Sequence, residues 1–167
     1  MAISKTKILQ TIKSLDCLYN QTSDTNLKTY YSKLALLELC GWIELAMDDI
    51  ILCCLRRCLK NQDYIKHVKS EVKKNSAFDY ENNFRNLLIK VVGLMNFEKL
   101  ERKINPLSLV TLKATLDKLK PLRNSHAHTY LKGCTQVLNA PSVTKGDFIV
   151  VFNALKDYER TLKKLKL

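Results

Sequence analysis

Two of the three histidines of this 167-residue chain lie in the segment Leu122–Tyr130, L-R-N-S-H-A-H-T-Y. His126 and His128 follow Arg123 by three and five residues. Histidine has a reference pKa of about 6.5, which suits proton transfer at neutral pH. The planar guanidinium of arginine offers two parallel donors to two phosphate oxygens. The segment therefore predicts a site that transfers protons beside a bound phosphate.

Metal-free cleavage of RNA needs a base for the 2′-hydroxyl proton and a cation for the charge that gathers on the phosphate. Arg123 and a nearby histidine are the candidates for these two roles, and Asn124 can orient the histidine or bind a phosphate oxygen. The segment shows no clear second acid or base. A two-fold dimer would bring two Arg/His pairs to one cleft.

The segment is expected to continue a helix through Pro121 with a kink. Leu109, Leu112, Leu116 and Leu119, spaced 3, 4 and 3, mark the buried face of this helix, and further steps of three or four reach Arg123 and Ala127. A buried guanidinium is costly unless it is paired or lines a wet cleft. Two interpretations stay open. Arg123 lines such a cleft, or it pairs with Glu44 or Asp48 and the histidines are partly exposed helix residues.

The elements that would position this segment are helical, because the chain has only four glycines and three prolines. Apolar residues make up 46% and charged residues 26%, which is typical of a globular domain and not of a disordered chain. We expect one all-α domain over residues 1–167, an antiparallel bundle of about five to seven helices. The expected helices begin at Ser4, at Asp24 or Thr25, at Asp63, at Asp79, after Asn105-Pro106, and at Thr144 or Asp147 after a loop from Gly133 to Lys145.

The longest expected helix, over residues 27–60, is apolar on nearly every side of its middle. Such a helix must be covered on every side, by its own bundle or by another copy of the chain. Glu38, Glu44, Asp48 and Asp49 interrupt its apolar run, so it does not predict a membrane span. With no signal-peptide pattern near the start, we expect a cytoplasmic protein.

The net charge and the cysteine spacing restrict the classes of partner and cofactor that we expect. The difference of 28 basic and 16 acidic residues gives +12, which favours nucleic acid or an anionic membrane face, although lysines can also serve solubility alone. A membrane-surface role for Lys156–Lys166 is disfavoured, because the apolar face of that helix is needed to close the bundle. The six cysteines show no Cys-x2-Cys pairing, so we expect no disulfide, metal or cofactor.

The string Arg123-Asn124-Ser125-His126-Ala127-His128 resembles the R-N-x-x-A-H motif of the HEPN superfamily, a group of all-helical proteins that includes ribonucleases. The order of elements is also similar: a long apolar helix, the motif near the start of a late helix, and one more helix behind it. The E-L-C-G-W-I-E run at Glu38–Glu44 resembles the RiboL-PSP-HEPN branch.

This resemblance implies a metal-independent endoribonuclease that works as a homodimer and leaves a 2′,3′-cyclic phosphate. Arg123 and His128 would be the catalytic pair, supported by Asn124, with Glu44 or Asp48 as an acidic residue facing the motif. Such proteins serve as toxins under the control of an antitoxin, in phage defence, or in RNA processing. The superfamily also contains members without catalysis, so a helical interaction or nucleic-acid-binding module is the alternative.

Overall fold

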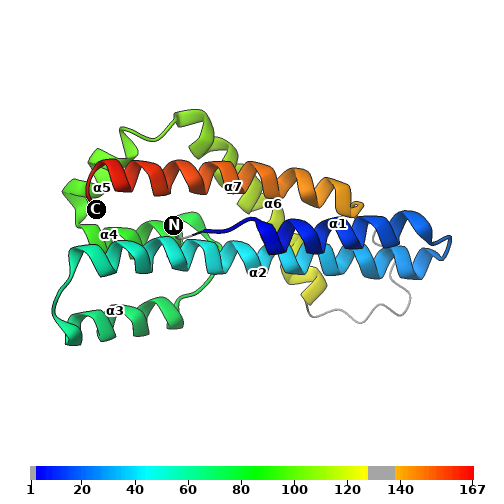
Figure 1. The fold of residues 1–167 in the computed structure, drawn as a ribbon, viewed down its shortest axis with the longest axis horizontal. Coiled ribbons are helices and arrows are strands. Elements are labelled where there is room, and N and C mark those ends of the chain that lie inside the picture. Colours follow the sequence, from blue (N-terminus) through cyan, green and yellow to red (C-terminus); the bar gives the residue numbers. More distant parts are fainter. Residues whose placement is uncertain (1–2, 128–137) are drawn as a thin grey trace.

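The computed structural model describes residues 3–127 and 138–167. Within these ranges it contains seven α-helices, one π-helical segment and no strand, which confirms the predicted all-α helical bundle (Figure 1). The elements are α1 (Thr6–Gln21), α2 (Thr25–Cys58), α3 (Gln62–Lys74), the π-helix η1 (Tyr80–Arg85), α4 (Asn86–Val92), α5 (Leu94–Glu101), α6 (Pro106–Ala127) and α7 (Pro141–Lys164).

Helix α2 is the axis of the fold, and α1, α4, α6 and α7 all pack against it (Figure 1). Asp24 starts this helix, because its side chain accepts hydrogen bonds from the main-chain N–H groups of Asn26 and Leu27, at 2.7 and 3.3 Å. This agrees with the predicted cap. The bundle buries most of the apolar surface of α2, but it leaves the side chains of Leu34 and Leu45 exposed.

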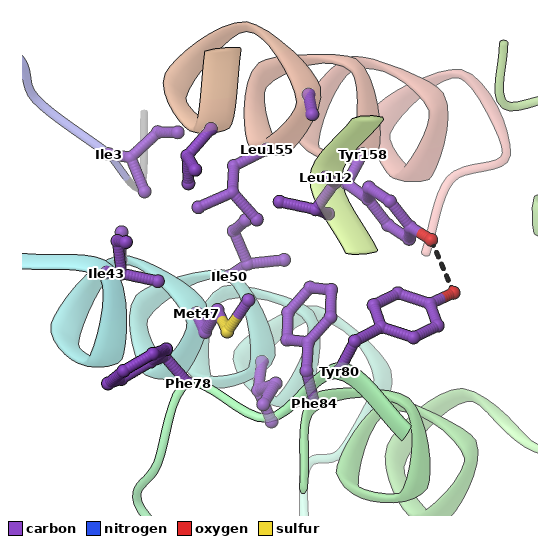
Figure 2. Packing of buried hydrophobic residues seen from close by; sticks show 14 of the residues in the cluster. Ile3, Ile43, Met47, Ile50, Phe78, Tyr80, Phe84, Leu112, Leu155 and Tyr158 are labelled. Atoms are coloured by element: carbon purple, nitrogen blue, oxygen red, sulfur yellow. Dashed lines mark hydrogen bonds between the residues drawn. The ribbon is translucent and has the colours of Figure 1, made fainter. Parts of the chain in front are cut away.

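The core lies between the second half of α2 and the facing sides of α7 and η1. Figure 2 shows Met47 and Ile50 of α2 beneath Leu155 of α7, in a cluster of fully buried side chains. At its edge the hydroxyls of Tyr80 and Tyr158 are joined by a buried hydrogen bond of 2.6 Å. This bond satisfies two polar groups that would be costly to bury alone, and it ties η1 to α7.

Two predicted helix starts are wrong. Ser4 does not cap α1: the cap position is Lys5, without a side-chain hydrogen bond, and the carbonyl of Ser4 accepts from the indole nitrogen of Trp42 at 3.0 Å. Helix α7 begins at Pro141 and not at Thr144 or Asp147, so the predicted loop does not reach Lys145. Proline suits the first position of a helix, because its fixed φ is helical and its missing N–H would have no helical partner there.

The predicted helix after Asp79 exists, but it is interrupted. Asp79 accepts from the N–H of Asn82 at 2.9 Å and starts η1, as expected for a cap. Helix α4 then ends at Gly93, which has a φ of 81° that glycine adopts without strain. Met95, two residues after this break, belongs to α5 and is exposed.

None of the helices in the described ranges has both the length and the apolar character needed to cross a bilayer.

Candidate functional site

The described part of α6 carries Arg123, Asn124 and His126 in its last two turns. The helix continues through Pro121, as predicted, but these residues lie at its end and not near the start of a helix as the resemblance implied. His128, the predicted catalytic histidine, lies outside the described residues. Of the predicted catalytic pair, the structure therefore describes the surroundings of Arg123 alone.

The buried face of α6 ends on His126 and not on Arg123 and Ala127. Leu112, Leu119 and His126 are seven residues apart, almost two full turns, and His126 is only 2% exposed. Arg123 and Ala127 were predicted on this face, but they lie at its edge and on the exposed side. The interpretation in which both histidines are partly exposed helix residues is wrong for His126, and His128 lies outside the described residues.

His126 is a poor candidate for catalysis. No described group bonds to its buried Nδ1. Burial lowers the pKa of its imidazole, and the nearby positive charge of Lys33 lowers it further, so the side chain is neutral at pH 7. This agrees with the resemblance, in which His126 occupies a variable position of the motif.

Arg123 lies at the rim of a hollow of about 190 Å³ between α6, α2 and the segment that leads into η1. Its side chain is 37% exposed. One guanidinium nitrogen, Nη2, is 3.6 Å from Oε1 of Glu44, and the other, Nη1, donates to Oδ1 of Asn124 at 3.3 Å. The hollow is lined by Glu44, Ser76, Ala77, Phe78, Asp79, Lys120, Arg123 and Asn124.

Of the two candidate acids, Glu44 is the one that faces Arg123. Burial raises the pKa of Glu44, the positive charge of Arg123 opposes this, and the negative charge of Asp48 adds to it. Asp48 accepts a hydrogen bond from the hydroxyl of Ser76 at 2.7 Å. Burial raises the pKa of Asp48 as well, and the bond from Ser76 partly offsets this.

Neither a scan of protein-family models nor searches of curated proteins and of solved structures found a match to this chain.

Lys120 and Asp79 complete the hollow, and neither was predicted as a site residue, although Asp79 was predicted as a helix cap. The ammonium group of Lys120 pairs with the carboxylate of Asp79, so the start of η1 is tied to α6 one turn before Arg123. Burial alone would raise the pKa of Asp79, but hydrogen bonds from Lys120 and Asn82 and the charge of Lys120 outweigh it and lower the pKa to about 2. The spacing of Lys120, three residues before Arg123, was a signal that could have found it.

The side chains around the hollow can bind an oxyanion. Arg123 offers a fork of donors, Asn124 adds an amide, and Lys120 adds an ammonium group that is already paired with Asp79. Glu44 occupies part of this fork, so an incoming phosphate must take over from the carboxylate. In the two described ranges, no three His, Cys, Asp or Glu side chains come together as a metal site.

Proposed function

We propose that this chain is a metal-independent endoribonuclease of the HEPN type, in which Arg123 and His128 act at a cleft between two copies. The observation that carries the proposal is the position of Arg123. Its guanidinium is at the rim of a hollow, partly open to solvent, and not inside the core. A phosphate can reach it there, and the loss of one exposed carboxylate contact is a small cost.

The proposed reaction breaks one phosphodiester bond. A histidine removes the proton of the 2′-hydroxyl, the resulting oxygen attacks the phosphorus, and the 5′-oxygen leaves with a proton from an acid. The products are a 2′,3′-cyclic phosphate and a 5′-hydroxyl, so atoms and charge balance without a metal. His128 supplies the proton transfers, one in each copy, while Arg123 and Asn124 hold the phosphate oxygens.

The exposed face of α2 supports the two-fold arrangement. Leu34 and Leu45 are 45% and 67% exposed and are separated by eleven residues, about three turns, so they lie on the same side of the helix. Glu44, next to Leu45, belongs to the Arg123 hollow. A second copy that covers this face would stand beside the hollow and could supply its own Arg123 and His128.

The experiment is incubation of mixed RNA with the purified protein in excess EDTA, followed by analysis of fragment ends. The parent should produce fragments with cyclic phosphate, and Arg123→Ala and His128→Ala should not. His67→Ala removes the third histidine, which is exposed on α3, and should cut like the parent. Equal cleavage by His128→Ala and the parent would show that the activity does not come from this motif.

Within a cell, such an activity fits a cytoplasmic toxin held in check by an antitoxin, or a nuclease of phage defence. Co-purification of a tightly bound inhibitor protein from the native host, released together with RNA cleavage, would support the first of these settings.

A second candidate function is a non-catalytic interaction module of the same fold. The contact of Arg123 with Glu44 favours this alternative, because such an ion pair can serve to hold α6 against α2. This alternative predicts no RNA cleavage by a folded dimer under any condition, and a large loss of stability when Arg123 is replaced.

A further inference from the structure

A cluster of five positive side chains lies at the end of the molecule where α2 and α7 both finish. We call this cluster the basic end, and it consists of Arg57, Lys60, Arg160, Lys164 and Lys166. The two stretches that supply it, residues 56–62 and 160–167, contain no aspartate or glutamate. All five side chains are exposed, so the charges face solvent.

The two stretches form one surface. The guanidinium of Arg57 donates to the main-chain oxygen of Leu167 at 3.2 Å, which joins the end of α2 to the residues after α7. Figure 1 shows the two helices finishing side by side. Arg160 and Lys164 are one turn apart on the same side of α7, and the contact of Arg57 with Leu167 lies just beyond the end of that helix.

The charges of the basic end are not neutralised within the chain. Over the described residues, no aspartate or glutamate carboxylate lies within ion-pair distance of any of its five members, and Arg57 contacts the main-chain oxygen of Leu167. Three glutamates of neighbouring elements are engaged elsewhere: Glu159 contacts Lys156 and Lys163, Glu98 contacts Arg102, and Glu101 contacts Arg85. The carboxylate in sequence nearest to Lys60 is Asp63, in the first turn of α3.

Helix-end stabilisation does not account for the whole cluster. Cations in the last turn of a helix are favoured by its dipole, but this effect fades within one turn. Arg160 precedes the last turn of α7, and Lys60 lies beyond the end of α2. Lys166 has a φ of 59°, the left-handed conformation in which glycine is usual after a helix. At this position the backbone conformation favours glycine, but the chain carries a lysine.

We infer that the basic end binds the phosphate backbone of single-stranded RNA, as a docking surface separate from the Arg123 hollow. Unpaired cations that face solvent are complementary to a polyanion. The exposed ring of Tyr64, four residues beyond Lys60, offers a face on which a base can stack. The apolar side chains between the cations, Leu59, Leu165 and Leu167, pack against the core, so none is free to enter a bilayer.

The docking surface and the hollow lie along the same helix. Arg57 follows Glu44 by thirteen residues of α2, which is roughly 20 Å along the helix axis. An RNA strand several nucleotides long can span this separation. The inference takes its ligand class from the proposed function, but binding at the basic end does not require cleavage at Arg123.

The experiment measures binding of a fluorescently labelled 2′-O-methyl oligouridylate, which cannot be cut by 2′-hydroxyl attack. The test variant is Lys60→Gln/Arg160→Gln/Lys164→Gln, which leaves the Arg57–Leu167 contact in place. The matched control, Lys13→Gln/Lys28→Gln/Lys145→Gln, removes the same charge from α1 and from the starts of α2 and α7, nearer the other end of the molecule (Figure 1). Thermal unfolding checks that both variants are folded.

The test variant should bind at least roughly tenfold more weakly than the parent at low salt, and its salt dependence on a log–log plot should be less steep by about 2, or ~0.7 for each lost phosphate contact. The control should change little. Equal weakening of both variants would mean diffuse attraction and would overturn the assignment. So would unchanged binding by the test variant, or selective binding of the parent to phosphatidylserine vesicles without RNA binding. RNA cleavage is assayed separately. A protein that binds the oligonucleotide at the basic end but does not cut RNA would contradict the proposed function and not the docking surface.

Discussion

Replacement of Arg123 by alanine separates a cleft-lining arginine from a structural one. The closest guanidinium nitrogen is 3.6 Å from the carboxylate of Glu44, and the two side chains are 37% and 24% exposed. At that distance the attraction is ~1 kcal/mol at the dielectric constant of water, and desolvation and side-chain ordering offset part of any gain from burial. We therefore expect Arg123→Ala to lower the free energy of unfolding by about 1 kcal/mol, while RNA cleavage is lost.

The assay is urea unfolding at pH 7, with thermal unfolding as a second measurement. A loss of 1 kcal/mol corresponds to a fall in Tm of roughly 2–4 °C for a domain of this size. Leu119→Ala, which removes a fully buried side chain from the same helix, provides the scale, because such changes cost ~2–5 kcal/mol. A loss of 3 kcal/mol or more for Arg123→Ala would refute the reasoning, because it would mean that Arg123 compensates a buried charge.

The pH dependence gives an independent check. Burial raises the pKa of Glu44, so the stability linked to this group is present at acid pH and is lost as the pH rises through the raised value. Removal of Arg123 takes away the charge that opposes this rise. The cost of Arg123→Ala should therefore be larger at neutral pH and smaller at a pH where Glu44 is protonated. In the Glu44→Gln background the cost should lose this pH dependence.

Three further predictions concern the elements around the site. Asp79→Asn should lower the free energy of unfolding by on the order of 2 kcal/mol at pH 7, because the ionised carboxylate is favoured in the folded state, where its pKa is lowered to about 2. This cost, measured by urea unfolding, should shrink as the pH falls from about 4 toward 2. Tyr158→Phe should cost ~1 kcal/mol for the lost hydrogen bond to Tyr80, and an unchanged Tm would contradict the role given to that bond. Gly93→Ala should lower the free energy of unfolding by ~1–2 kcal/mol, because alanine disfavours a φ of 81° although space is open around the position. A more stable variant would contradict the positive φ at the break between α4 and α5.

The fold was predictable because its signals are local and repeated. Ile8, Ile12 and Leu15, spaced four and three residues apart, form the buried face of α1, and Asp24 predicted the start of α2. The wrong starts depended on weaker signals. Pro141 was assigned to a loop, although proline is also favoured at the first position of a helix. Ser4 failed as a cap because its carbonyl is held by Trp42, a contact 38 residues away in sequence.

The candidate site was predictable only in part. Contact of Arg123 with an acid of α2 was one of two interpretations, and the structure places Glu44 in that position while Arg123 remains open to the hollow. Steps of three or four residues could not decide whether Arg123 or His126 continues the buried face, because both fit a period of 3.6 within one residue. Asp79 and Lys120 are 41 residues apart, and only the folded chain brings them together.

Pro121 has a consequence for the motions of α6. Pro121 is two residues before Arg123 and has no N–H. The carbonyl of Asp117 therefore lacks the hydrogen bond that a helix normally provides. The turns that carry Leu112 and Leu119 are fixed by fully buried side chains, whereas the turn after Pro121 is held by the buried His126, by the partly buried Leu122 and by the contact of Arg123 with Glu44. In amide hydrogen exchange, this last turn should open as a separate unit, ahead of the rest of the helix. Such opening would let Arg123 change direction without unfolding the helix that supports it.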